Sequence, residues 1–94
     1  MYILLLDYIK SIEEIDEELD KHADYLERHY SSGHFICSGR RKPRTGGVIL
    51  CNAKNKAEVE DIIAQDPFKQ KCLDHYTIIE FSPSKCATGF EGFI

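Results

Sequence analysis

The sequence predicts an α+β domain built from a four-stranded antiparallel sheet with two helices on one face. Three observations support this fold class. Apolar residues recur at helical spacing in two segments, they cluster or alternate as in strands in four others, and the six segments follow the order strand, helix, strand, strand, helix, strand. The chain has 94 residues, which is the length of one modest domain.

The first strand and the first helix are expected in the N-terminal third of the chain. Residues 2–9 are rich in Ile, Leu and Tyr and predict a buried strand. Ser11 and Glu14 form a capping box, and Gly33 suits a helix end, so one helix is expected from residue 11 to about residue 32. Its apolar stripe runs through Ile12, Ile15, Leu19, Ala23, Leu26 and Tyr30.

A hairpin is expected next. Residues 34–38 and 47–52 have strand character, and the segment 39–46 between them is rich in turn-forming residues and too short for a helix. Two cysteines of the hairpin, Cys37 and Cys51, could be cross-strand neighbours, which leaves a disulfide open beside reduced thiols. The four cysteines include no close pair of the kind that structural zinc sites use.

The second helix has its own start signal. Asn55 can cap it, with Glu58 at the third helical position. Its inner face is expected to carry Val59, Ile62 and Ile63. A short helix should follow, with Asp66 as its cap and Pro67 in its first turn.

The last strand is expected at residues 75–81, and the chain is one domain with a core of residues 1–82 and a tail of residues 83–94. This element order is the ferredoxin-like split βαβ arrangement, in which one sheet face lacks a cover. We therefore expect a homodimer with a two-fold axis that stacks the two sheets. The tail contains apolar residues that need a surface and could pack at that interface: Phe90, Phe93 and Ile94.

Composition excludes several classes of function. Apolar residues make up 43% of the chain and charged residues 30%, as in ordinary globular proteins. No apolar run approaches the roughly 18 residues that a membrane span needs, and no export signal is visible, so we expect a cytoplasmic protein. The net charge of −4 argues against nucleic-acid binding.

His22 is the most informative single residue, because it places a titratable ring on the stripe that faces the core. Asp66 is the natural partner. A carboxylate that accepts the proton of one imidazole nitrogen fixes the tautomer and leaves the other nitrogen free to exchange a proton with a substrate. The two residues are thus a candidate acid-base pair.

Other roles for this pair remain open. His22 could merely satisfy a buried hydrogen bond while Asp66 caps the turn at Pro67. A metal site with a third ligand is another option, but no ligand spacing supports it, and we expect neither a metal nor a cofactor. The remaining histidines, His29, His34 and His75, are expected at the surface.

Five segments, in this order, resemble the YciI-like (YCII-related) family: the helix with His22, the Ser38-Gly39 step, the Pro43-Arg44-Thr45-Gly46-Gly47 turn, Asp66-Pro67-Phe68, and the closing Glu80-Phe81 strand. The resemblance covers nearly the whole chain. It implies a ferredoxin-like protomer, a dimeric α+β barrel with the sheets face to face, and a His-Asp dyad that maps onto His22 and Asp66. It implies little about the substrate.

Further residues are candidates for binding a ligand. Arg40, Arg41, Lys42 and Arg44 could form an anion clamp or simply a solvated loop. Arg44 is the preferred ligand-binding residue, since Pro43 stiffens the loop before it and the resemblance places this turn beside the pocket. Ser38 is expected to point into the same space, and Phe68 to form a pocket wall or part of the core. A phenol could come from Tyr2, Tyr8 or Tyr76.

Two functions from different classes follow. The first is a small cofactor-independent enzyme of isomerase or lyase type that moves a proton on a cyclic or aromatic, anionic metabolite, with His22 as acid or base and Asp66 orienting it. The alternative is a non-catalytic dimeric protein, either ligand-binding or accessory, in which the dyad is structural.

Overall fold

Four strands form one antiparallel sheet in the computed structural model, which describes all residues from Met1 to Ile94. The strands are β1 (Tyr2–Tyr8), β2 (Phe35–Arg40), β3 (Gly46–Cys51) and β4 (Asp74–Glu80). Their order across the sheet is β2-β3-β1-β4, and every pair is antiparallel. The predicted α+β, ferredoxin-like fold is therefore confirmed.

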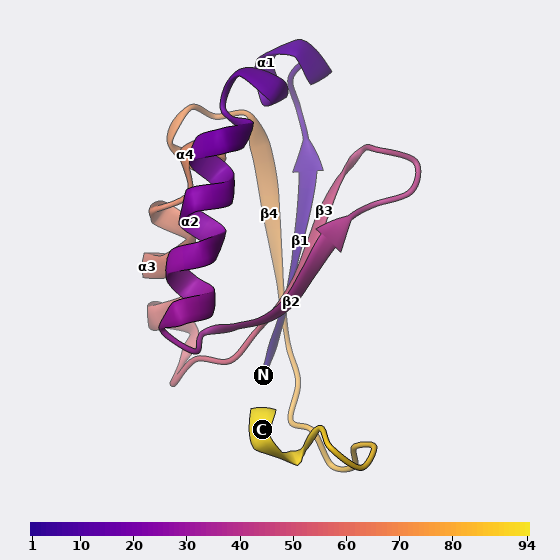
Figure 1. Cartoon of the computed structure of the whole chain (residues 1–94). Coiled ribbons are helices and arrows are strands. Elements are labelled where there is room, and N and C mark those ends of the chain that lie inside the picture. Colours follow the sequence, from indigo (N-terminus) through magenta and orange to yellow (C-terminus); the bar gives the residue numbers. More distant parts are fainter.

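The helices lie on one face of this sheet, and no helix covers the other face (Figure 1). They are α1 (Ile12–Glu17), α2 (Leu19–Ser31), α3 (Lys56–Ala64) and α4 (Pro67–Gln70), and a short 3-10 helix, η1 (Glu91–Phe93), closes the chain. The core lies between the two layers. It combines inward side chains of the strands with one face of α2 and α3: Tyr2, Leu4, Leu6, Tyr25, Phe35, Ile49, Cys51, Val59, Ile62 and Ile63.

The expected single N-terminal helix is two helices, which corrects the sequence interpretation. Glu18 sits at the junction, and its backbone N–H donates to the carbonyl oxygens of Asp16 and Ile15 rather than continuing the α-helical pattern. Its carboxylate is almost fully buried and accepts from Lys71 Nζ at 2.9 Å, beyond the end of α4. The apolar period continues across the break, so it could not reveal this long-range contact.

The two hairpin cysteines are not cross-strand neighbours, so that expectation is wrong. Cys51 is opposite Phe35, and Cys37 is opposite Leu50, because the register shifts between Phe35 and Cys37. Such a bulge adds a residue to one strand and moves the following side chains. Cys51 is buried, Cys37 is exposed, and all four cysteines are free.

The predicted start of α3 is confirmed, because the Asn55 side chain accepts from the backbone N–H of Glu58 at 2.9 Å. Gly33 follows the end of α2 with a φ of +85°, a conformation that favours glycine. No helix is long and apolar enough to cross a membrane. The tail runs beyond one end of the sheet (Figure 1), where the Phe93 carbonyl accepts from Asn52 Nδ2 at 2.9 Å.

Candidate active site

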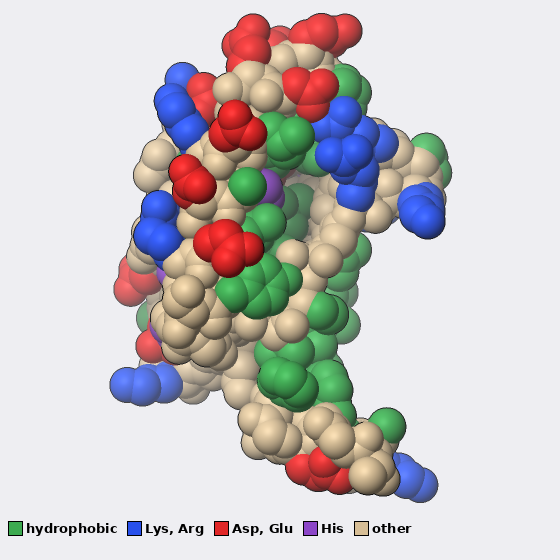
Figure 2. Space-filling model, in the orientation of Figure 1, with side chains coloured by type: hydrophobic (Ala, Val, Ile, Leu, Met, Phe, Trp, Pro, Cys, Tyr) green, Lys and Arg blue, Asp and Glu red, His purple; other side chains and the backbone are tan.

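A cavity of about 170 Å³ opens on the helix side of the sheet, between α2, α4 and the β2-β3 hairpin. Figure 2 shows a histidine inside a hollow among hydrophobic side chains, with Lys and Arg side chains gathered at its rim. Most of the lining is apolar or backbone, and the polar side chains in it are few. The lining residues are Leu6, Tyr8, Leu19, His22, Leu26, Ser38, Gly39, Arg40, Gly46, Gly47, Val48, Ile49 and Phe68.

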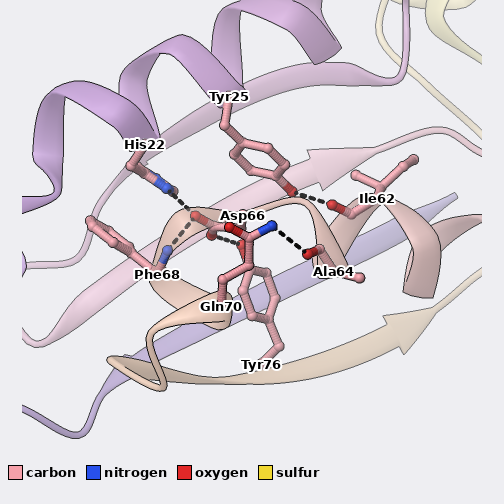
Figure 3. A network of polar contacts seen from close by, with 8 residues as sticks. All are labelled: His22, Tyr25, Ile62, Ala64, Asp66, Phe68, Gln70 and Tyr76. Atoms are coloured by element: carbon pink, nitrogen blue, oxygen red, sulfur yellow. Dashed lines mark hydrogen bonds and ion pairs between the residues drawn. The ribbon is translucent and has the colours of Figure 1, made fainter.

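His22, which lines this cavity, points toward Asp66 (Figure 3). His22 Nδ1 lies 2.8 Å from Asp66 Oδ1, with 12% of the His22 side chain exposed and none of the Asp66 side chain. The same Oδ1 accepts from the backbone N–H of Phe68 at 3.0 Å, and Oδ2 accepts from the Tyr76 hydroxyl. Asp66 therefore caps α4 and receives three donors while fully buried.

This network assigns the tautomer of His22. Asp66 Oδ1 already accepts a backbone N–H, and Tyr76 donates to Oδ2, so the carboxylate acts as an acceptor throughout. The proton between His22 and Asp66 must then be on Nδ1. Nε2 makes no hydrogen bond within the protein and carries the free lone pair. The free nitrogen belongs to a residue that lines the cavity.

Aromatic packing fixes the imidazole plane. The rings of His22 and Phe68 are stacked, with centroids 4.1 Å apart and an interplanar angle of 4°. Tyr8 meets Phe68 edge-on, with centroids 6.1 Å apart. Because Phe68 is also the residue whose N–H Asp66 caps, one short segment both orients the ring and holds its partner.

The buried Tyr25 and the partly buried Tyr76 complete the network. Burial raises the pKa of both Tyr25 and Tyr76, so their hydroxyls stay protonated and act as donors. Tyr25 donates to the Ile62 carbonyl at 3.0 Å, and Tyr76 donates to Asp66. Of the three tyrosines proposed as a source of a phenol, Tyr76 is thus the one that contacts the acid of the pair, while Tyr8 lines the cavity and Tyr2 contacts Glu80.

A second carboxyl group near this network was missed from the sequence. Asp74 is only 3% exposed, and neither of its oxygens has a hydrogen-bond partner. Burial, followed by the negative charge of Asp66, raises the pKa of Asp74 to about 7. The available signal was strand alternation, because Asp74 shares the inward face of β4 with Tyr76 and Ile78.

The sequence-predicted binding residues have different positions. Ser38 and Phe68 line the cavity, and the Ser38 hydroxyl lies 2.6 Å from that of Tyr30. Arg44 does not line it and instead forms an ion pair with Asp16, which raises the pKa of Arg44 further. Arg40 is the arginine in the lining.

His29 is buried rather than exposed, so this expectation was wrong. It is 7% exposed and packs against Tyr25 with ring centroids 4.9 Å apart. Its Nε2 donates to Gln65 Oε1 at 3.0 Å, and burial lowers its pKa, which keeps the ring neutral. The inward face of α2 is centred on His22, Tyr25 and His29, whereas Ala23 is exposed. His75 is at the surface as expected, and His34 is partly buried.

No group of three or more His, Cys, Asp or Glu side chains is arranged to hold a metal ion. The cavity offers a ligand four kinds of surface: an imidazole nitrogen of His22, the hydroxyl of Ser38, the guanidinium of Arg40 and apolar side chains.

Comparisons with known proteins agree with this fold. A search of curated proteins found no significant match. Among solved structures, the chain is similar to 5-chloro-2-hydroxyhydroquinone dehydrochlorinase (TftG) from Burkholderia phenoliruptrix AC1100, in complex with 2,5-dihydroxybenzoquinone. The TM-score is 0.73 at 19% sequence identity, over 87% of this chain and 94% of that one.

The family comparison covers most of the sequence. The model of the YCII-related domain matches residues 1–82, which include the whole sheet, all four α-helices and the His22-Asp66 pair. With that match over the same elements that build the cavity, the chain belongs to the YCII-related domain family.

Proposed function

We propose that this protein is a small enzyme that uses His22 as a general acid or base on a cyclic, anionic metabolite. The observation that carries the proposal is the 2.8 Å contact between His22 Nδ1 and Asp66 Oδ1 beside a cavity, with Nε2 left without a protein partner. A fixed tautomer with one free nitrogen is what proton transfer to or from a bound substrate requires.

The cavity suits a single ring. An apolar cavity of about 150 Å³ is enough for benzene, and this one has about 170 Å³ with an open side. A positioned acid-base group contributes on the order of 10² to 10⁴ in rate, which fits an isomerisation or an elimination on an activated ring. His22 would take a proton from carbon, and the electron pair would shift within the ring or expel a leaving group.

The structural neighbour supports this reaction class. The name of that protein describes the removal of chlorine from a hydroxylated ring, and its bound molecule is a dihydroxybenzoquinone. An elimination of this kind needs a base near a ring in a small pocket, which is the arrangement that His22, Phe68 and the cavity offer here.

A non-catalytic role is the second candidate, and the complete hydrogen bonding of the Asp66 carboxylate within the protein favours it. Asp66 receives three donors and caps α4, so the pair stabilises the structure whatever else it does. In this alternative the protein binds a small ligand, or serves as an accessory protein, without turning anything over.

We also propose a homodimer. The outer face of the sheet carries apolar side chains on β1, β3 and β4 that no helix covers (Figure 1): Ile3, Leu5, Val48, Leu50 and Ile79. Packing two such faces around a two-fold axis would remove them from water. The tail, with Phe93 and Ile94 about half exposed, would gain a surface at the edge of that interface.

Hydrogen exchange at carbon tests the enzyme directly. Halogenated hydroquinones, hydroxyquinones and cyclic dienones are incubated with the protein in D₂O, and NMR follows deuterium incorporation and leaving-group release. We expect exchange on at least one ring, and its loss in His22→Gln. His75→Gln, which changes an exposed histidine, is the control. Ring binding with no exchange on any compound would favour the non-catalytic alternative.

A further inference from the structure

Arg40 is the one arginine of the hairpin that has no partner in the protein. Arg41 is paired with Asp7, and Arg44 is paired with Asp16. Arg40 forms no ion pair and no hydrogen bond through its side chain, yet it lines the cavity together with His22. Arg41 and Arg44 thus have acidic partners within the chain, whereas the guanidinium of Arg40 is available to bind a ligand.

The sheet register explains why Arg40 faces the cavity. Ser38 is opposite Ile49 and Arg40 is opposite Gly47, so the two residues share the helix-side face of β2. Gly39, between them, belongs to the other face. Because Gly47 has no side chain, the sheet beside Arg40 stays open at this position, and both residues join the lining.

The charges around the cavity favour an anion. The two acidic residues near the hairpin, Asp7 and Asp16, are neutralised by Arg41 and Arg44. Inside, the lining side chains are mainly leucine, isoleucine and aromatic. An anionic oxygen that enters with a ring therefore meets the unpaired guanidinium of Arg40 and no carboxylate among the lining residues. Lys and Arg side chains gather beside the hollow, and Asp and Glu side chains also lie around it (Figure 2).

We propose, on the basis of the function above, that Arg40 binds the anionic oxygen of the substrate and so sets the preference for acidic rings. The ligand class is a single ring bearing a carboxylate or an acidic hydroxyl. A guanidinium forms charge-assisted, often bidentate, hydrogen bonds to such oxygens. The ring would lie between Arg40 and His22, with Phe68 and the leucines around it. Arg44 would have to leave Asp16 before it could bind the same group.

Binding of a matched pair of probes tests this assignment. Salicylate carries the carboxylate, and salicylamide has nearly the same shape without the charge. Isothermal titration and NMR titration are run on wild type, Arg40→Gln and Arg40→Lys. We expect wild type to prefer salicylate, and Arg40→Gln to weaken salicylate binding by about ten- to a hundredfold. Salicylamide binding should change less than about threefold, and Arg40→Lys should recover part of the affinity because it restores the charge.

Arg41→Gln and Arg44→Gln are the matched controls, since each removes one charge from the same hairpin. Both should leave the preference for salicylate within about threefold of wild type. A larger loss in Arg44→Gln than in Arg40→Gln would overturn the assignment, and so would a wild type that binds neither probe or does not distinguish them. His22→Gln should retain the preference for salicylate. If Arg40-dependent binding is found but hydrogen exchange is not, this site stands and the enzymatic proposal fails.

Discussion

The contacts of the His22 imidazole determine how much stability the protein should lose when the ring is removed. Asp66 holds Nδ1, Phe68 covers one ring face, and 12% of the side chain remains exposed at the cavity. If the ring were lost, Asp66 would keep the donors from Phe68 and Tyr76, and water could enter from the cavity. A carboxylate with two remaining donors is not an orphaned buried charge.

For His22→Ala we therefore expect the free energy of unfolding to fall by less than about 1 kcal/mol, while hydrogen exchange on the ring substrates is abolished. Urea unfolding of both proteins, paired with the exchange assay, measures the two effects. A loss of roughly 3 kcal/mol with no ligand bound by wild type would instead show a structural histidine.

Ionisation of Asp74 should make the free energy of unfolding depend on pH. Its pKa is raised from 3.8 to about 7 by burial and by Asp66, and neither oxygen has a partner. A raised carboxyl pKa means that the folded state favours the protonated form, so this contribution is fully present below pH 4 and is lost as pH rises to about 7. His22 and Lys69 oppose the shift, and the charge of Asp66 adds to it.

Asp74→Asn removes the ionisation and keeps the shape. We expect the variant to be more stable than wild type by about 1 to 3 kcal/mol at pH 8, and the difference to shrink towards zero at pH 4. Denaturant unfolding across this range measures it, and Asp61→Asn, at an exposed position of α3, is the control. A constant difference at all pH values would contradict the assigned ionisation.

Residues whose position depends on local pattern could be predicted, and those whose position depends on distant contacts could not. Helical spacing placed His22 inward, and cap chemistry placed Asp66 before α4. Which arginine turns to the cavity depends on the pairing of β2 with β3, including the bulge, and on the partners that Arg41 and Arg44 find. The inward position of Asp74 ran against the expectation that a lone carboxylate stays in water.

At the scale of elements, start and stop signals were more reliable than the continuity of a helix. Ser11 and Asn55 both accept from the backbone N–H three residues later, as expected of caps. At the break, Glu18 pairs with Lys71, more than fifty positions away in the sequence, and no local signal marks this contact. The break matters for function because α2, which carries His22, begins just after it.

Gly33, the glycine that follows the end of α2, allows a direct test of a helix stop signal. Gly33 has a φ of +85°, and a Cβ placed there would meet nothing within 4 Å, so its substitution costs only backbone strain. We expect Gly33→Ala to lower the free energy of unfolding by about 1 kcal/mol, because a left-handed conformation is unfavourable for alanine. Gly92→Ala, also without nearby atoms but without a positive φ, should stay within about 0.5 kcal/mol of wild type. Equal effects of the two substitutions would contradict this reason.

At the scale of the whole molecule, the sheet has one face packed by helices and one face without a cover (Figure 1). Leu5 lies near the middle of that open face, between Val48 on β3 and Thr77 on β4. Val48 on β3 is 37% exposed, and Ile79 on β4, at the other side of β1, is 43% exposed, so apolar surface is open to water on both sides of β1. The cavity is on the opposite, helix-covered side, so dimerisation through the open face would leave His22, Phe68 and Arg40 in place.

We therefore expect light scattering at micromolar concentration to give twice the chain mass of 10.8 kDa, and Leu5→Lys to give the mass of one chain. A lysine at the centre of a face-to-face sheet interface would bury charges without partners, whereas on a free surface it would be tolerated. Ala57→Lys adds the same charge at an exposed position of α3 and should leave the mass unchanged. Circular dichroism of Leu5→Lys separates dissociation from unfolding. A dissociated but folded protomer keeps the helical signal of wild type, whereas an unfolded chain loses it. A wild type with the mass of a single chain would show that the open face is solvated, and the homodimer would then have to be abandoned.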